Sequence, residues 1–172
     1  MSELIKKLIR DVPNFPKEGI IFKDITPLLG SKDGFKHTID KLAAKIEGEH
    51  PDVILGVESR GFIFGAPLAY KLNCPFVPVR KKGKLPYKTH SAEYALEYGT
   101  DSLEIHVDAF EKGSKVVIVD DLLATGGTSK AVIDLIEKCG GVVSSLLFVV
   151  ELSFLNGRDQ LKDYTVHSLV VY

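Results

Sequence analysis

The chain of 172 residues contains no tryptophan, one methionine and two cysteines. Cys74 and Cys139 stand far apart, without Cys-x-x-Cys or Cys/His ligand spacing. This argues against a disulfide framework or a zinc site. We therefore expect two reduced thiols in the protein core.

Long apolar runs and an excess of one charge are also missing. No run approaches the length of a membrane span, and Met1 to Arg10 lacks the apolar core of a signal peptide. The sequence therefore predicts a cytoplasmic protein with no membrane contact. The net charge is only -1, which gives no general basic surface, so duplex nucleic acid is not an expected partner.

What the chain does contain is 45% hydrophobic residues, which at this length favours one globular domain with a substantial core. Apolar runs of strand length alternate with segments of helical periodicity, and no repeat or linker interrupts them. This alternation predicts an α/β fold with a mostly parallel sheet whose carboxyl ends share one crevice. We expect strands at 53–57, 76–79, 103–107 (half-exposed), 116–119, 142–150 and 165–172, and helices at 2–10, 34–47 and 62–72, with a last helix along the apolar stripe from Ala131 to Cys139.

The most informative stretch is Val116 to Thr128. Four β-branched apolar residues come first and predict a strand buried on both faces. Asp120 and Asp121 follow, and two carboxylates at a strand end need water, a cation or a hydroxyl-rich ligand, because an unpaired buried carboxylate is costly. In the next residues, Ala124 to Thr128, glycine amides, threonine hydroxyls and the start of a helix favour an anion. We interpret the stretch as a site for a phosphorylated sugar.

Other phosphate-binding loops do not fit these residues. The spacing of a P-loop is absent, since Lys130 falls two residues beyond Thr128, and so is the Gly-x-Gly-x-x-Gly pattern of a Rossmann fold. The remaining alternative is a capped turn at a strand end without any ligand. A lone Gly-Gly would favour that alternative, but here carboxylates and anion donors adjoin, which favours a functional site.

Two further predicted strands end in polar turns. Glu58-Ser59-Arg60-Gly61 follows the strand at 53–57, and Arg60 is there either a surface charge or a bidentate clamp for phosphate. Its place at a strand-to-helix turn favours the clamp. The basic run from Arg80 to Lys84 follows the strand at 76–79. Such a run is usually a solvated loop, but at a strand end it could help to hold a pyrophosphate.

The segment from Leu85 to Asp101 is polar and has weak periodicity. A long insertion of this kind in a compact domain is typical of a mobile active-site lid. Glu97 and Tyr98 lie within it.

Taken together, these motifs resemble those of the type I phosphoribosyltransferases, and especially of the members that use adenine. Val116 to Thr128 is similar to the family signature, and the other matches follow the family's order over nearly the whole chain. They are Phe15-Pro16, Gly19 to Pro27, Glu58 to Phe62, Arg80 to Pro86, Glu97 to Gly99 and Val150 to Leu152. The resemblance implies a single domain over 1–172 with the type I fold, a central mostly parallel sheet flanked by helices. It also implies a small hood from about 1–30 and 151–165, and a flexible lid loop at about 80–107.

The implied activity is that of a glycosyltransferase of purine salvage. It would convert adenine and 5-phosphoribosyl 1-pyrophosphate to AMP and pyrophosphate, as a homodimer, with Mg²⁺ carried by the substrate and no metal bound directly by the protein. Breaking the anomeric bond builds positive charge on the ribose and negative charge on the leaving pyrophosphate, which cations must stabilise. A closing lid would exclude water, the competing nucleophile.

The resemblance also assigns residues to these roles. Asp120 and Asp121 would contact the ribose hydroxyls, and the 5-phosphate would be bound by Ala124, Thr125, Gly126, Gly127 and Thr128. Pyrophosphate would be bound by Glu58, Ser59, Arg60, Arg80, Lys81 and Lys84, some of them across the dimer interface, and the Glu58-Ser59 peptide is expected to be cis. Adenine would be bound by Ile20, Ile21, Phe22, Lys23 and Leu152, with Lys23 where relatives often carry Arg.

Two residues are expected to be catalytic, Arg60 and Glu97. Glu97 could accept the proton that adenine loses from N9, or it is an exposed charge of the lid, where Tyr98 would also lie. A regulator of the same fold that senses phosphoribosyl pyrophosphate is a weaker alternative, because the first thirty or so residues are neither strongly basic nor a helix-turn-helix.

A closer alternative is an enzyme that uses hypoxanthine, guanine or xanthine. Relatives that use 6-oxo purines typically place a Lys near the end of the strand after the phosphate loop, as a donor to O6. Here that strand ends in Glu151-Leu152-Ser153, which favours adenine.

Overall fold

The computed structural model describes residues 3–95 and 100–172. A seven-stranded sheet has the order β5-β6-β4-β3-β7-β8-β9. Its strands are β3 (Val53–Val57), β4 (Phe76–Lys81), β5 (Thr89–Ala95), β6 (Thr100–His106), β7 (Lys115–Leu123), β8 (Val142–Glu151) and β9 (Thr165–Val171). The helices are α1 (Glu3–Lys7), α2 (Thr26–Gly30), α3 (Lys32–Lys45), α4 (Arg60–Leu72) and α5 (Gly127–Lys138).

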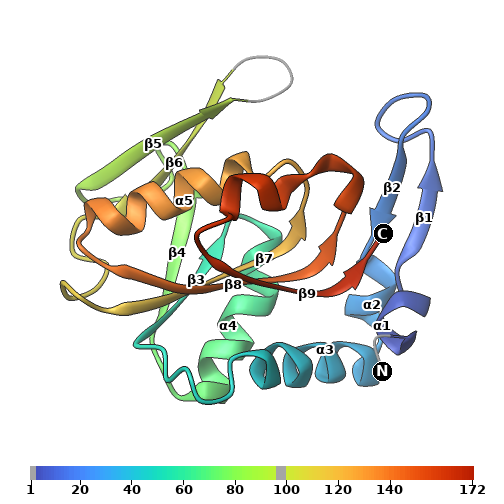
Figure 1. Cartoon of the computed structure of the whole chain (residues 1–172), viewed down its shortest axis with the longest axis horizontal. Coiled ribbons are helices and arrows are strands. Elements are labelled where there is room, and N and C mark those ends of the chain that lie inside the picture. Colours follow the sequence, from blue (N-terminus) through green and yellow to red (C-terminus); the bar gives the residue numbers. More distant parts are fainter. Residues whose placement is uncertain (1–2, 96–99) are drawn as a thin grey trace.

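Most of the sheet is parallel. The strands β4, β3, β7, β8 and β9 pair in parallel, whereas β6 is antiparallel to both β4 and β5. A separate two-stranded antiparallel sheet, β1 (Arg10–Pro13) with β2 (Ile21–Asp24), lies beside the C-terminus (Figure 1). Two short 3-10 helices, η1 (Ser153–Leu155) and η2 (Gly157–Leu161), connect β8 to β9.

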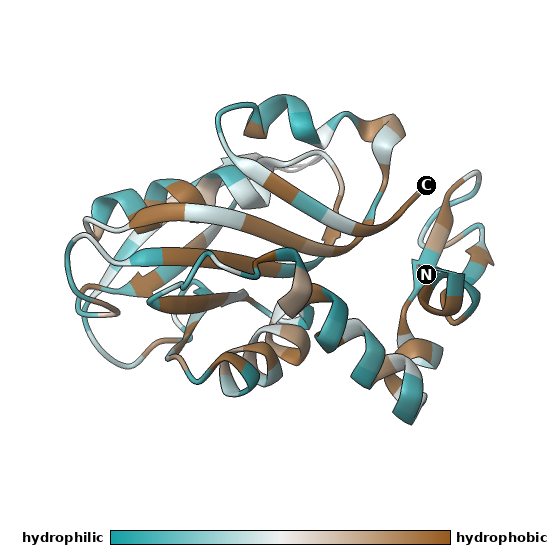
Figure 2. Cartoon of the chain, turned by 60° about the horizontal axis from the view of Figure 1, so that its bottom comes forward, coloured by the Kyte–Doolittle hydropathy of each residue, from teal (hydrophilic) through white to brown (hydrophobic). Residues whose placement is uncertain are grey.

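The helices cover both faces of the sheet and bury its central strands. In β7, Val116 and Ile118 belong to the core cluster under α5, while Val117 and Val119 belong to the cluster under α3 and α4. Figure 2 shows strands with long hydrophobic stretches, and helices in which hydrophobic and hydrophilic residues alternate along the ribbon. Burial on both faces explains why these strands are continuous apolar runs rather than alternating ones.

The predicted helix at 34–47 is confirmed as α3, which begins at Lys32 and ends at Lys45. Ser31 Oγ accepts a hydrogen bond of 3.1 Å from Gly34 N, so Ser31 is its N-cap. The first helix is shorter than predicted and ends at Lys7, because Arg10 begins β1. There it pairs with Asp24 of β2, with Nη2 2.6 Å from Oδ2.

The segment between β4 and β7 differs most from the sequence prediction. Residues 85–101 are not irregular throughout, since Thr89–Ala95 forms β5 and pairs with β6. The predicted strand at 103–107 is confirmed as part of β6, which ends at His106, but its predicted half-exposed pattern was wrong. Leu103, Glu104 and Ile105 are all buried, because β6 lies between β5 and β4 and α5 packs on the two outer strands.

The remaining expectations concern thiols and membrane spans. Cys74 is half-buried, Cys139 is buried, and both thiols are free, as predicted. Among the described residues, no helix is long and apolar enough to cross a membrane.

Candidate active site

A crevice opens where the parallel strands end at their carboxyl edge. It has a volume of about 450 Å³ and is formed by the ends of β3, β4 and β7, the start of α4 and the β5-β6 hairpin. Its lining residues are Val57, Glu58, Ser59, Arg60, Lys81, Tyr94, Leu103, Asp120, Asp121, Leu122, Ala124 and Thr128. The structure thus brings the predicted ribose, phosphate and pyrophosphate residues of three strand ends into one place.

The two aspartates lie inside β7 rather than beyond its end. The strand continues to Leu123 and pairs with β8 along this stretch, so the predicted strand end at Val119 was too early. Asp121 is only 6% exposed, and its Oδ2 lies 2.8 Å from Arg60 Nε. Asp120 Oδ1 accepts a hydrogen bond of 2.9 Å from Asp121 N.

Burial changes the protonation of this pair. Removal from water raises the pKa of Asp120 well above its ordinary value, and the neighbouring Asp121 charge raises it further. Burial also raises the pKa of Asp121, although the Arg60 guanidinium opposes that shift. The pair therefore holds its negative charge at a cost that a ligand bearing hydroxyl donors can offset.

Gly61, in the first turn of α4, allows Arg60 to approach the pair. A Cβ at this position would be 2.7 Å from the Val119 carbonyl oxygen and 3.1 Å from Asp120 Oδ1. Any other residue would push α4 away from β7. The preceding Glu58-Ser59 peptide is cis, as the family resemblance predicts.

The phosphate loop, residues 124–128, forms a second hollow of about 70 Å³ that adjoins the crevice. Gly126, with φ 87°, is the N-cap of α5 and provides no side-chain cap. The amides of the first turn of a helix have no partner within the helix, and they carry its positive dipole end. The hollow therefore suits a phosphate group.

The basic cluster is attached to the crevice through Glu58. Arg80 Nη2 lies 3.1 Å from Glu58 Oε1, Lys81 N donates to Glu58 Oε2 at 2.8 Å, and Arg80 Nη1 donates to the Lys84 carbonyl at 3.3 Å. Burial opposes the shift, but the Arg80 hydrogen bond holds the pKa of Glu58 below its usual value. Glu58 thus fixes the position of the Arg80 side chain and of the Lys81 backbone amide. Among the predicted pyrophosphate residues, Arg80 and Lys84 lie beside the crevice lining rather than in it.

Tyr94 and Asp101, which had no predicted role, form contacts beside Lys81 of the crevice. Lys81 Nζ lies 3.0 Å from Asp101 Oδ2, and Tyr94 Oη donates to the same oxygen at 3.2 Å. Tyr94 and Asp101 face each other across the β5-β6 pair. The sequence would have indicated this contact only if the β5-β6 hairpin had been recognised. The weak periodicity of the segment from Leu85 to Asp101 concealed that hairpin.

The residues predicted to bind adenine lie in the small sheet and at the end of β8. The Phe22 ring centroid is 5.8 Å from Arg60 Cζ, which places β2 beside the crevice, and Ile20 and Ile21 are exposed. Lys23 instead has its ammonium 3.9 Å from the Tyr172 ring centroid and 2.7 Å from Asp11 Oδ1. Leu152 is half-buried, and its backbone N donates to the Leu123 carbonyl at 2.9 Å. Glu97 and Tyr98, predicted for the lid, lie outside the described residues.

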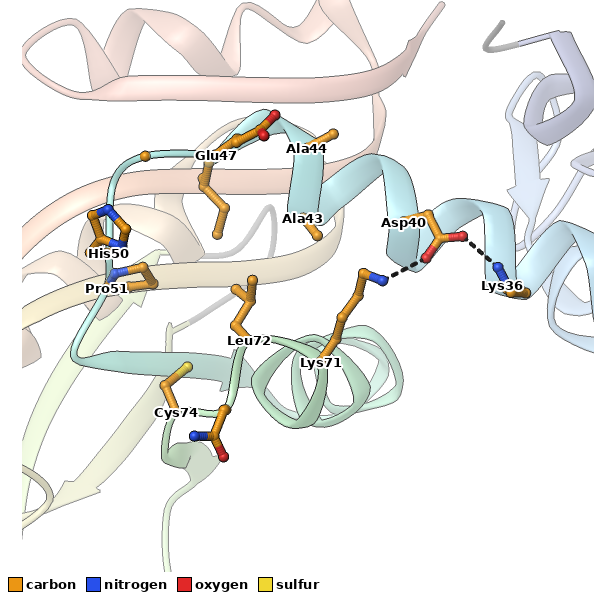
Figure 3. A pocket seen from close by; sticks show the side chains of 13 residues that line it. Lys36, Asp40, Ala43, Ala44, Glu47, His50, Pro51, Lys71, Leu72 and Cys74 are labelled. Atoms are coloured by element: carbon orange, nitrogen blue, oxygen red, sulfur yellow. Dashed lines mark hydrogen bonds and ion pairs between the residues drawn. The ribbon is translucent and has the colours of Figure 1, made fainter.

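A larger hollow of about 700 Å³ lies between the C-terminal ends of α3 and α4 (Figure 3). It is at the opposite edge of the sheet, where β3 and β4 begin. Asp40 at its rim is already paired with Lys36 at 2.8 Å and with Lys71 at 3.0 Å. The crevice, in contrast, gathers the predicted site residues.

The fold and the crevice are those of a phosphoribosyltransferase. The model of the phosphoribosyl transferase domain matches residues 29–165, which is most of the chain. The chain therefore belongs to the phosphoribosyltransferase family, and the predicted type I fold is confirmed.

Individual relatives show which members of the family this chain is similar to. Adenine phosphoribosyltransferase of Acetivibrio thermocellus is 60% identical over 170 residues, which cover 98% of this chain and 99% of the relative. That of Brachyspira hyodysenteriae is 57% identical over 168 residues, with coverage of 98% and 99%. The crystal structure of adenine phosphoribosyltransferase from Thermoanaerobacter pseudethanolicus superposes with a TM-score of 0.97 at 56% identity, covering 100% of both chains. Within the family, the chain groups with the adenine phosphoribosyltransferases.

Proposed function

We propose that this chain joins adenine to 5-phosphoribosyl 1-pyrophosphate in the crevice, releasing AMP and pyrophosphate in purine salvage. The observation that carries the proposal is that the buried Asp121 pairs with Arg60, while its half-buried neighbour Asp120 lines the same hollow as the phosphate loop. The Saccharomyces cerevisiae adenine phosphoribosyltransferase, 42% identical with a TM-score of 0.94, has been solved with adenine and an imino-altritol bisphosphate. That ligand set supports a site for a base beside a phosphorylated sugar.

The residues of the crevice divide the reaction among them. The Asp120 and Asp121 carboxylates accept from the ribose hydroxyls and favour the positive charge that develops on the ribose as the anomeric bond breaks. The loop from Ala124 to Thr128 holds the 5-phosphate at the start of α5. Arg60 and Lys81 stabilise the charge of the leaving pyrophosphate, with Arg80 and Lys84 beside them.

Magnesium fits this site as part of the substrate. Among residues 3–95 and 100–172, no group of three or more His, Cys, Asp or Glu side chains could hold a metal ion. Mg²⁺ would take most of its ligands from pyrophosphate and ribose oxygens, and would supply charge neutralisation to the leaving group. In this proposal Glu97 accepts the proton that adenine loses from N9, and Tyr98 is a residue of the lid.

The base would lie between the small sheet and the end of β8, where a backbone carbonyl near Ile21 accepts from the 6-amino group. A 6-oxo purine would place two acceptors opposite each other, and a buried mismatch of this kind costs about 1 to 3 kcal/mol. Steady-state assays of nucleotide formation with adenine, hypoxanthine, guanine and xanthine test the proposal. Adenine should have the highest kcat/KM, by about tenfold or more. Equal use of hypoxanthine would refute the base assignment, and no transfer to any base would refute the function.

The chain would act as a homodimer through α4. Ile63, Pro67 and Tyr70 lie along one outer side of this helix, and Tyr70 is 90% exposed. A second copy of this chain would pack on this side of α4. Because α4 begins with Arg60, pairing of the two α4 helices would stiffen the crevice of each subunit. Sedimentation should show a dimer for the wild type and a monomer for Ile63→Asp combined with Tyr70→Ala. A dimer that survives both changes would place the interface elsewhere.

The domain arrangement and location follow the same reasoning. The whole chain forms one domain, with a hood from about 1–30 and 151–165 over the base and a lid from about 80–107 over the sugar. The free thiols of Cys74 and Cys139 support a cytoplasmic location.

A further inference from the structure

The back of the phosphate loop packs against η2. Gln160 Nε2 donates a hydrogen bond of 3.0 Å to the Thr125 carbonyl. A Cβ on Gly126 would be 2.6 Å from the Gly157 carbonyl oxygen, and a Cβ on Gly157 would collide with the Ala124 carbonyl oxygen. The two backbones therefore touch over several residues, with glycine at both points where they come closest.

η2 is itself fixed firmly to the sheet. Arg158 donates from Nε and Nη2 to the two carboxylate oxygens of Glu151 at 2.7 and 2.8 Å, and from Nη1 to the Val166 carbonyl at 3.1 Å. Ser168 Oγ donates to Glu151 Oε2 at 2.5 Å, and Leu161, at the end of η2, is 1% exposed in the core. These contacts tie η2 to the end of β8 and to β9.

The position of Gln160 sets the direction of a loop amide. In a trans peptide, C=O and N–H point in opposite directions, so holding the Thr125 carbonyl toward η2 turns the Gly126 N–H away from η2. The hollow that suits the 5-phosphate is lined by Asp120 and residues 122–129, and no residue of η2 is among its lining residues. Gln160 therefore favours the loop conformation that presents its amide to an anion.

We propose that η2 is a brace for the phosphate loop and that Gln160 is a positioning residue for 5-phosphate binding, an inference that rests on the proposed function. Gln160 does not touch the substrate and acts through the Thr125-Gly126 peptide. Its side chain is exposed, so it can be replaced without opening the core.

Binding of ribose 5-phosphate and of pyrophosphate, each measured alone by calorimetry, tests the brace. Gln160→Met keeps the length of the side chain and removes the donor. It should weaken ribose 5-phosphate binding and raise KM for 5-phosphoribosyl 1-pyrophosphate by about fivefold, the effect of one lost hydrogen bond. KM for adenine, affinity for pyrophosphate and Tm should stay unchanged. Asp159→Asn, in the same 3-10 helix, is the matched control and should bind ribose 5-phosphate as the wild type does.

Gly157→Ala provides a second, steric perturbation. The added methyl group would push the loop at Ala124, so ribose 5-phosphate binding should fall further than in Gln160→Met. Gly30→Ala, where a Cβ meets nothing within 4 Å, is its control. If Gly157→Ala does not fold, Gln160→Met still decides.

If Gln160→Met binds ribose 5-phosphate with the same affinity as the wild type, the proposal that η2 braces the loop is wrong. An equal loss for both ligands with a lower Tm would also overturn it, because that pattern indicates a merely structural role. Failure of the proposed function is a separate result: the wild-type chain would then form no AMP, whatever the effect of Gln160→Met on ribose 5-phosphate binding.

Discussion

Asp120 is predicted to be necessary for activity and unfavourable for stability. It is half-buried in β7 next to the buried Asp121, and removal of its carboxyl group from water raises its pKa well above the ordinary value of 3.8. Asp120→Asn removes the charge but keeps an oxygen that can accept from Asp121 N, as Oδ1 does now at 2.9 Å. The variant therefore isolates the charge from the shape and the hydrogen bond.

At pH 7 the variant should be more stable than the wild type. Relief of one poorly solvated charge is worth about 1 to 2 kcal/mol in unfolding free energy, or a rise in Tm of about 4 °C for a chain of this size. Activity should move in the opposite direction. Loss of charge-assisted hydrogen bonds to the ribose costs about 1.5 to 3 kcal/mol, which lowers kcat/KM about 10- to 150-fold.

The stability difference should depend on pH in a defined direction. A carboxyl group whose pKa is raised by folding binds more protons in the folded state, so wild-type stability falls as pH rises from 3.8 through the higher folded value. Asn does not titrate, so the advantage of Asp120→Asn should be small near pH 4 and grow toward neutral pH. Urea unfolding at a series of pH values, with AMP formation at pH 7, measures both effects.

Asp52→Asn is the matched control. Asp52 lies near the other end of β7 and is exposed, and its Oδ2 accepts from Lys115 N at 2.7 Å, a bond that Asn can keep. We expect a stability change within about 0.5 kcal/mol and unchanged activity. A less stable Asp120→Asn protein, an advantage that does not depend on pH, or near-native AMP formation would each refute the reasoning.

Two other predictions concern a structural ion pair and the metal. Arg158→Met should lower the unfolding free energy by about 2 to 3 kcal/mol at pH 7, because it leaves Glu151, whose side chain is 6% exposed, without its guanidinium partner. Since Arg158 holds the pKa of Glu151 below 4.5, the stabilisation is present above that value and should disappear in urea titrations as pH falls through the lower folded pKa. Chelation of Mg²⁺ should abolish AMP formation and leave Tm unchanged, and a fall in Tm on chelation would indicate a protein-bound metal.

The parallel centre of the fold could be predicted from the sequence because its signals are local. β3 is a continuous buried run and the first half of β7 is a continuous β-branched one, and α3 combines a Ser31 cap with an apolar stripe. In each case the side chains that decide the structure are neighbours in the sequence. The turns after these strands contain glycine beside charged residues, so residues that line the crevice could be predicted as site residues before the structure was known.

The hairpin and the brace depend on contacts that the sequence separates. β5 is polar, and its pairing with β6 is stabilised by Tyr94 reaching Asp101 and by Lys138 of α5 donating to the Ser91 carbonyl at 2.8 Å. Gln160 reaches the phosphate loop 35 residues earlier. No periodic pattern marks such residues, because their partners become neighbours only after the sheet has formed.

Two carboxylates near the ends of β7 and β8, the half-buried Asp120 and the buried Glu151, have opposite surroundings. At the end of β8, Glu151 receives two hydrogen bonds from Arg158 and one from Ser168, so its charge is satisfied within the chain and its pKa falls. In β7, Asp120 accepts a hydrogen bond from the Asp121 backbone amide, and burial and the neighbouring Asp121 charge raise its pKa. A satisfied carboxylate stabilises the scaffold, whereas an unsatisfied one gains by binding a ligand with hydroxyl donors. Glu151 fixes η2 through Arg158, and Asp120 keeps the acceptor that the proposed function gives to the ribose hydroxyls, so the two neighbouring strands would divide stability and binding between them.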